Sequence, residues 1–263
     1  MMSENQHWLL SEEAHIVTLT LNRPEVMNSL AAETLLELRD ITAQLCERRD
    51  VWVVIIQGQG KHFSVGMDLK QLPEGIKQRG SPDVIFDQRL KVLRDIETLN
   101  KPVIAVMCGY CLGGGLELPL ACHFRLAAEE GTQMGLPEMD LGTVPAWGGS
   151  ARLTRRVGRD HALDLILRAR KISGPEAYRI GLVTEVHPLA DLFGKAHQLA
   201  HDLAAQPALA VQAMLRCIVG SEGKTLDESL ADERAAVHET LGSPDAMEGM
   251  MAFLEKRKPV FNQ

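Results

Sequence analysis

Residues 101–140 constrain the fold more than any other stretch of this chain. The stretch opens with an apolar run typical of a buried strand, residues 102–107, and then reaches three consecutive glycines, residues 113–115. An apolar helix is expected after the glycines, and a second strand at residues 124–128. The first turn of a helix has unbonded N–H groups that point outward, so a strand, a glycine turn and a helix start together can hold negative charge. This stretch therefore predicts a site where an anion develops.

Apolar patterning in the rest of the chain predicts an α/β fold with a sheet layered against helices. A continuous apolar run at residues 50–57 is typical of a strand buried on both faces. Helix followed by apolar strand occurs twice, which favours such layering. Strand signals stop near residue 200, where we place a boundary between a core at residues 1–200 and a helical region at residues 201–263.

The expected elements follow from periodicity and capping signals. We expect strands at residues 8–10, 15–21, 50–57, 102–107, 124–128 and 182–187, with a turn at residues 11–14. We expect helices at residues 31–48, 82–100, 151–157 and 161–169, and another from a capping Ser173 to Gly181. From residue 188 the pattern is helical, with breaks at residues 206–207, 220–223 and 242–244.

Composition limits the partners that the chain can have. A formal charge of −7 argues against binding to a nucleic acid backbone, which needs clustered basic residues. Five cysteines show no zinc-ligand spacing, and we interpret them as reduced thiols of a cytoplasmic protein. The N-terminus lacks a secretory signal pattern, and no stretch approaches the roughly 20 apolar residues of a membrane span. We therefore expect no nucleic acid, membrane or metal partner.

Five separated motifs resemble those of the enoyl-CoA hydratase/isomerase, or crotonase, superfamily, and they occur in the family's order. The resemblance covers nearly the whole chain. It implies a crotonase-like spiral of ββα repeats, followed by a C-terminal helical region for oligomerisation into a homotrimer or a hexamer. Periodicity alone does not indicate the spiral. The motifs are LNRPEVMNSL (residues 21–30), GKHFSVGMDL (60–69), KPVIAVMCGYCLGGGLEL (101–118), GLPEMDLGTVP (135–145) and AFLEKRKPVF (252–261).

The resemblance implies an acyl-CoA thioester as the substrate, with no metal or redox cofactor, since coenzyme A is part of the substrate itself. Addition at the β-carbon or proton removal at the α-carbon places negative charge on the thioester oxygen. Two backbone N–H donors can hold that oxygen, and one such donor is typically worth about 3–4 kcal/mol of barrier. By resemblance these oxyanion donors are the N–H groups of Met67 and Gly114.

Two acids, Glu117 and Glu138, match the glutamates of the family's hydratases. Hydration needs a base that takes a proton from water and an acid that gives one to the α-carbon, so two carboxyl groups around one water suffice. Our working hypothesis is that Glu117 activates the water and Glu138 delivers the α-proton, and the opposite assignment stays open. The alternative is that each glutamate is a solvated surface charge, the usual fate of an isolated acid.

Six further residues are expected to contact the substrate by resemblance. Ala146 stands where many hydratases have glycine, and it keeps the N–H group that glycine would supply. Trp147 stands where they have a small residue, and its indole could cap the acyl pocket or pack at a subunit contact. The six residues are Val65, Asp68, Leu69, Lys70, Ala146 and Trp147.

The sequence gives weaker evidence for the roles of several other charged side chains. Lysines could meet the phosphates of coenzyme A, although such charges are more often simply solvated. We expect Asp140 and His123 to have structural roles. The candidate lysines are Lys61, Lys70, Lys256 and Lys258.

The favoured function is reversible hydration of a 2-enoyl-CoA to a 3-hydroxyacyl-CoA. A 3-enoyl-CoA to 2-enoyl-CoA isomerase is the nearest alternative, and it can dispense with the second acid. Other acyl-CoA lyases and hydrolases of the superfamily are also possible. A non-catalytic scaffold that binds acyl-CoA or RNA is an alternative of another class, disfavoured by the two retained carboxylates and by the acidic charge.

Overall fold

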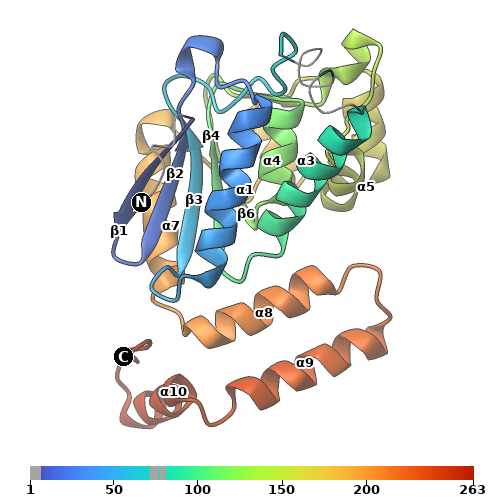
Figure 1. Cartoon of the computed structure of the whole chain (residues 1–263). Helices are drawn as coiled ribbons and strands as arrows, with labels where there is room; N and C mark the ends of the chain where they lie inside the picture. The colour runs from blue at the N-terminus through green and yellow to red at the C-terminus, as the bar shows by residue number, and fades with distance from the viewer. Residues whose placement is uncertain (1–6, 72–76, 78–80) are drawn as a thin grey trace.

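The computed structural model describes residues 7–71, 77 and 81–263. A six-stranded sheet runs through its centre (Figure 1). The first two strands form an antiparallel hairpin, and every further neighbour pair is parallel. In spatial order the strands are β1 (Trp8–Glu13), β2 (Ile16–Leu21), β3 (Val53–Gly58), β4 (Val103–Met107), β6 (Phe124–Ala128) and β8 (Glu185–His187).

The central strands are apolar on both faces because helices cover both sides of the sheet. Side chains alternate along β3, so that Val54 and Ile56 join the larger hydrophobic core while Val53 and Ile55 join a second one. The larger core lies against α1 (Ala32–Glu47), α3 (Pro82–Glu97), α4 (Gly114–Ala121) and α5 (Gly149–Leu167). The second core is closed by α7 (Leu189–Ala204). The continuous apolar runs in the sequence thus correspond to strands between two helical layers.

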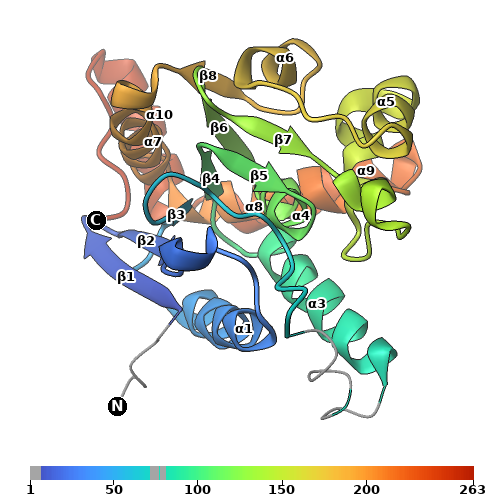
Figure 2. The ribbon, with the colours of Figure 1, turned by 90° about the horizontal axis from the view of Figure 1, so that it is seen from above.

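A second, smaller sheet forms beside the first, and the sequence patterns do not predict it. It pairs β5 (Tyr110–Leu112) with β7 (Gln133–Gly135) in parallel (Figure 2). The chain therefore runs β4–β5–α4 and then β6–β7–α5, with the short helix η2 (Pro137–Leu141) before α5. This is the expected ββα repeat. Strands of three residues are too short to show a period of two, which explains why β5 and β7 were missed.

The hairpin turn is tighter than expected. The two predicted strands and the turn between them are confirmed, but the turn is shorter than residues 11–14. Strand β1 continues through Glu13, so that only Ala14 and His15, with φ of 45° and 69°, lie between the strands. Ser11 and Glu12 pair with β2 through their backbones on the outer strand of the sheet. Their polar side chains are exposed there, so polarity does not end the strand.

Local signals place most helix ends correctly. Ser81 caps α3 by accepting from the Asp83 N–H, and Ser173 caps α6 (Gly174–Arg179) by accepting from the Glu176 N–H. The two helices expected at residues 151–169 form a single α5 that is interrupted at Gly158, whose φ of 78° is not helical. A short helix, η1 (Pro24–Val26), follows β2.

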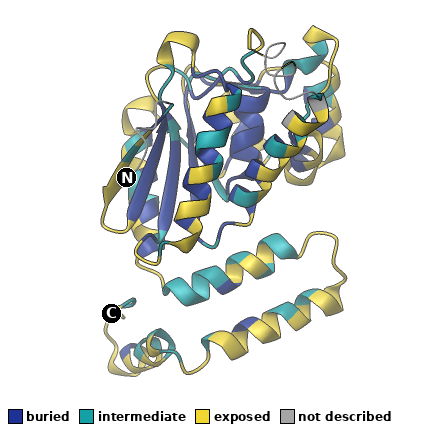
Figure 3. Ribbon diagram, in the orientation of Figure 1, coloured by how far each residue is buried: buried dark blue, intermediate teal, exposed yellow. Residues whose placement is uncertain are grey.

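The C-terminal helices extend away from the sheet. They are α8 (Ala208–Gly220), α9 (Leu226–Thr240) and α10 (Pro244–Glu255), separated at the predicted breaks. Most residues of α9 and α10 are exposed and most of α8 are half-buried, in contrast to the buried sheet and α4 (Figure 3). The domain boundary that we place at residue 200 lies inside α7, and it stays a prediction. Among the described helices no single one is long and apolar enough to cross a membrane, and α7 and α8 reach that length only together, across a bend of 106°.

Candidate active site

Two backbone amides lie where the loop at residues 60–69 meets the start of α4. A Cβ on Gly66, whose φ is +90°, would lie 2.5 Å from the Leu112 carbonyl oxygen and 3.1 Å from the Gly114 nitrogen. Only glycine lets the two backbones approach this closely. The loop is held by the Leu30 N–H, which donates to the Gly66 carbonyl at 2.7 Å. Neither the Met67 N–H nor the Gly114 N–H donates to another described residue, so both predicted oxyanion donors can serve a ligand.

Glu138 lies against the glycine turn that starts α4. A Cβ on Gly113 would lie 2.8 Å from the Glu138 Oε1, and Gly113 has a φ of +54° that favours glycine. The Glu138 Oε2 is buried and has no hydrogen-bond partner among the described residues. Burial raises the pKa of Glu138, and a backbone N–H partly opposes this effect. A buried carboxyl oxygen without a protein partner is rare, and it points to a functional group.

Glu117 lies in the first turns of α4 and is almost fully buried, with 2% of its surface exposed. Its Oε1 accepts two backbone hydrogen bonds, from the Trp147 N–H at 2.8 Å and the Gly149 N–H at 2.7 Å. Burial raises the pKa of Glu117 to about 7, the two N–H donors oppose the shift, and the neighbouring Glu138 adds to it. A carboxyl group with a pKa near neutrality can act as a general base at physiological pH.

Trp147 covers the start of α4 from within the same chain. Its side chain is 2% exposed, and a Cβ on Gly114 would lie 2.4 Å from its indole ring. The indole also contacts Arg89, whose guanidinium carbon lies 4.8 Å from the ring centroid in a cation–π geometry. Arg89 also donates to the Met67 Sδ at 3.0 Å. Trp147, Arg89 and Met67 thus form one cluster beside the two predicted oxyanion donors, and the indole needs no neighbouring subunit to be buried.

The other expected contact residues lie in different surroundings. Val65 and Ala146 are half-buried, and Ala146 packs against the larger core. Asp68 forms an ion pair with Arg23 at 3.1 Å, with both side chains 11% exposed, so its carboxylate already has a structural partner. Leu69 and Lys70 are exposed. Their contact with a substrate stays a prediction.

The remaining charged residues are divided between surface and interior. Lys61, Lys256 and Lys258 are exposed, as is Asp140. His123 is held between the Val103 N–H and the Glu97 carbonyl oxygen, and burial lowers its pKa to about 4. A neutral histidine bonded on both ring nitrogens fits the structural role expected for it.

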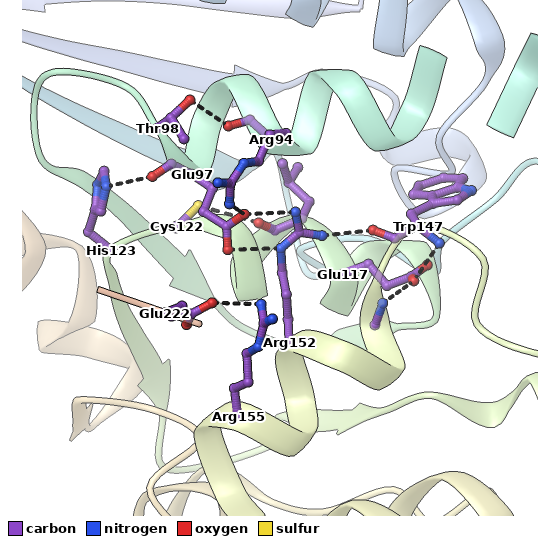
Figure 4. A network of polar contacts seen from close by, with 12 residues as sticks. Arg94, Glu97, Thr98, Glu117, Cys122, His123, Trp147, Arg152, Arg155 and Glu222 are labelled. Carbon is purple, nitrogen blue, oxygen red and sulfur yellow. Dashed lines mark hydrogen bonds and ion pairs between the residues drawn. The ribbon is translucent and has the colours of Figure 1, made fainter. Parts of the chain in front are cut away.

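Four residues near the site were not predicted from the sequence. Gly149 supplies an N–H to Glu117, Arg89 stacks on Trp147, and Arg152 and Glu97 form an ion pair close by (Figure 4). A signal for two of them exists, because Arg89 and Glu97 lie four residues before and after the buried Leu93, on the apolar side of α3. Such a residue predicts a buried polar partner, which periodicity cannot name.

Comparison with known proteins assigns the family. The model of the family enoyl-CoA hydratase/isomerase matches residues 11–263, and the chain belongs to this family. A crotonyl-CoA hydratase of Syntrophomonas wolfei is 37% identical over 256 residues, 96% of each chain. A short-chain-enoyl-CoA hydratase of Clostridium acetobutylicum is 35% identical over 251 residues, 95% of each chain. The crystal structure of an enoyl-CoA hydratase from Bacillus anthracis matches with a TM-score of 0.92 and 36% identity, covering 97% of this chain and 99% of that one.

These matches confirm the resemblance and the crotonase-like α/β fold, and they support an enzyme of this family. The roles of Glu117, Glu138, Met67 and Gly114 stay predictions. Their support is the geometry of the site, in which the buried Glu117, the half-buried Glu138 and two available amides gather at the start of one helix.

Proposed function

We propose that this enzyme catalyses the reversible hydration of a 2-enoyl-CoA to a 3-hydroxyacyl-CoA. The observation that carries the proposal is a pair of carboxyl groups beside the glycine turn of α4. Glu117 is buried, Glu138 is half-buried with a buried Oε2, and burial raises the pKa of both. A raised pKa lets one carboxyl group be protonated while the other is ionised near neutral pH. Hydration requires one ionised carboxyl group as base and one protonated carboxyl group as acid, whereas an isomerase needs one base only.

The proposed mechanism uses the chain's own groups. The thioester oxygen accepts hydrogen bonds from the Met67 and Gly114 amides, which stabilise the negative charge that develops on it. Glu117 takes a proton from water as the water oxygen bonds to the β-carbon. Glu138 gives its proton to the α-carbon, so that one water is added overall, and the proton taken up by Glu117 passes to Glu138 before the next turnover. These transfers are between carboxyl groups, water and carbon, and the proposed step needs no metal or redox cofactor.

The direct test is the conjugated thioester absorbance of crotonyl-CoA. We expect the absorbance to fall as water adds to the double bond, with the 3-hydroxyacyl product identified by mass. No turnover of crotonyl-CoA, together with turnover of a 3-enoyl-CoA, would reject hydration in favour of isomerisation. No turnover of either substrate, with retained acyl-CoA binding, would favour a binding role.

The pH dependence of kcat/KM follows from the pKa of Glu117 in the free enzyme. The base must be ionised, so kcat/KM should fall about tenfold per pH unit below a midpoint near pH 7. The charged groups that act on this carboxyl are Glu138, which raises its pKa, and Arg152, which lowers it. The measurement is kcat/KM for crotonyl-CoA between about pH 5 and 9, at substrate concentrations well below KM. A kcat/KM that stays constant down to pH 5 would show that Glu117 is not the base.

The indole of Trp147 should restrict the length of the acyl group. It occupies the space over Gly114, next to the proposed position of the thioester, and a hydrophobic pocket discriminates by about 1–3 kcal/mol per methylene. We expect the wild type to prefer crotonyl-CoA over 2-octenoyl-CoA and Trp147→Ala to shift the kcat/KM ratio toward octenoyl-CoA by about tenfold or more. Trp52→Ala is the matched control, because Trp52 stacks on His15 in another part of the molecule. An unchanged ratio in Trp147→Ala would mean that the indole does not limit the acyl group.

We also propose that the chain assembles as a homotrimer or as a hexamer built from two trimers. Large apolar side chains on the C-terminal helices support this, since surfaces of this kind favour association. Light scattering of the purified protein tests the proposal, and a monomer would reject it. The most exposed of these side chains are Ile218, Leu226, Leu241, Phe253 and Leu254.

A further inference from the structure

A buried ion pair lies next to the loop whose amides contact Glu117. Arg152 on α5 and Glu97 on α3 have side chains that are 10% and 11% exposed. The Arg152 Nε donates to the Glu97 Oε1 at 3.1 Å, and its Nη2 donates to the Glu97 Oε2 at 3.0 Å. This is the two-pronged arrangement that fixes a guanidinium in one plane (Figure 4). The pair therefore presents the third nitrogen of Arg152 in a defined direction.

That third nitrogen holds the carbonyl group of Trp147, the residue whose N–H contacts Glu117. The Arg152 Nη1 donates to the Trp147 carbonyl oxygen at 2.8 Å, while the N–H of the same tryptophan donates to the Glu117 Oε1. A Cβ on Gly148 would lie 2.4 Å from the Arg152 Nη1, so the guanidinium lies against the loop itself. The carbonyl and the N–H of Trp147 thus connect the ion pair to the Glu117 carboxyl group. Rotation of this residue would move its N–H away from Glu117.

Glu97 is itself fixed from more than one side. Arg94 donates to the Glu97 Oε2 at 2.9 Å, and His123 contacts the Glu97 carbonyl oxygen at 3.2 Å. Burial opposes ionisation of Glu97, but Arg152 and Arg94 outweigh it and hold the pKa of Glu97 below its usual range. The carboxylate is therefore ionised at neutral pH, and it orients Arg152 as a charged partner.

We propose that Arg152, oriented by Glu97, is a positioning residue that keeps the Trp147 and Gly149 amides directed at Glu117. The inference rests on the proposed function, because these two residues would act through Glu117 and would not contact the substrate themselves. Stability alone is a weak reason for such a pair, since well-packed apolar residues often replace a buried ion pair at no loss of stability. The bond from Arg152 to the Trp147 carbonyl is what an apolar pair could not reproduce.

The test compares a double variant with single ones. In Glu97→Met/Arg152→Met both charges are removed together, so no buried charge is left unpaired and the fold should persist. We expect its kcat for crotonyl-CoA to fall about 100-fold, because a small misplacement of a reacting group costs about that much, while KM changes by less than about threefold. The acidic limb of the pH profile should move to higher pH, since the Arg152 charge no longer favours ionised Glu117. Arg152→Lys keeps one donor and should lose only about tenfold.

Arg155→Met is the matched control. Arg155 lies three residues further along α5, its side chain is 54% exposed, and it pairs with Glu222. We expect this variant to keep kcat and the pH profile of the wild type. Wild-type kcat and an unmoved acidic limb in the folded double variant would overturn the inference and show that the pair only joins α3 to α5.

The remaining outcomes are also decisive. Should the double variant fail to fold, Arg152→Lys decides: a loss of about tenfold in kcat at unchanged KM supports positioning, and full activity overturns it. A wild-type protein that hydrates no 2-enoyl-CoA rejects the proposed function and this inference together. An active wild type with an unaffected Arg152 series rejects the inference alone.

Discussion

Replacing Glu138 by glutamine lowers kcat for crotonyl-CoA hydration by about 10³-fold to 10⁴-fold, the upper range for loss of a general acid. Glutamine has the same shape but no transferable proton, so the α-carbon cannot be protonated. The affinity for acyl-CoA should stay nearly unchanged, because the lost interaction acts mainly in the transition state. Initial rates with crotonyl-CoA measure the first effect, and calorimetric titration with unreactive butyryl-CoA measures the second.

Asp140→Asn is the matched control for this experiment. Asp140 lies two residues further along η2 and is exposed, so the same loss of charge should leave kcat unchanged. Near-normal turnover of Glu138→Gln would refute the assigned role. A parallel loss of butyryl-CoA affinity would mean that Glu138 also contributes to ground-state binding.

Replacing Glu117 by glutamine should cost about 10³-fold in kcat by removing the base. The fold around the site should persist, since the amide oxygen of glutamine can still accept from the Trp147 and Gly149 N–H groups. Activity that remains should no longer show an inflection near pH 7. If the variant kept both its rate and that inflection, the base would have to be another group.

The same substitution should stabilise the protein above neutral pH. Because the pKa of Glu117 is raised to about 7 on folding, its contribution to stability is greatest below the unfolded pKa and is lost as pH rises from about 4.5 to 7. Above pH 7 the ionised buried carboxylate costs on the order of 3 kcal/mol. Glu117→Gln removes that cost, so its melting temperature should exceed that of the wild type at pH 8 by several degrees and match it near pH 5. An equal difference at both pH values would contradict this account.

Local signals predicted many elements because they act over a few residues. Strand β6 lies on the predicted residues 124–128, and Ser173 caps α6 as its position before Gly174-Pro175-Glu176 indicates. The strands β5 and β7 were missed, since three residues carry no readable period. Their pairing depends on segments that lie more than twenty residues apart, which local patterns do not report.

In the candidate site, too, the sequence predicted some features and the tertiary structure decided others. Glu117, Glu138, Met67 and Gly114 were named from motifs, because a motif preserves residue type and spacing. The place of Trp147 was left between two alternatives, and the tertiary structure puts its indole on Gly114 inside one chain.

By itself the sequence determined the α/β class, the apolar strands, the helix breaks and the motif residues, because each depends on side-chain type and spacing along the chain. Only the tertiary structure decided that Glu117 is buried with two N–H donors, that Glu138 lies against Gly113, and that an ion pair stands behind them. Burial and contact depend on which distant segments pack together. Those same quantities set the pKa of a carboxyl group, so the chemistry of the site follows from the fold.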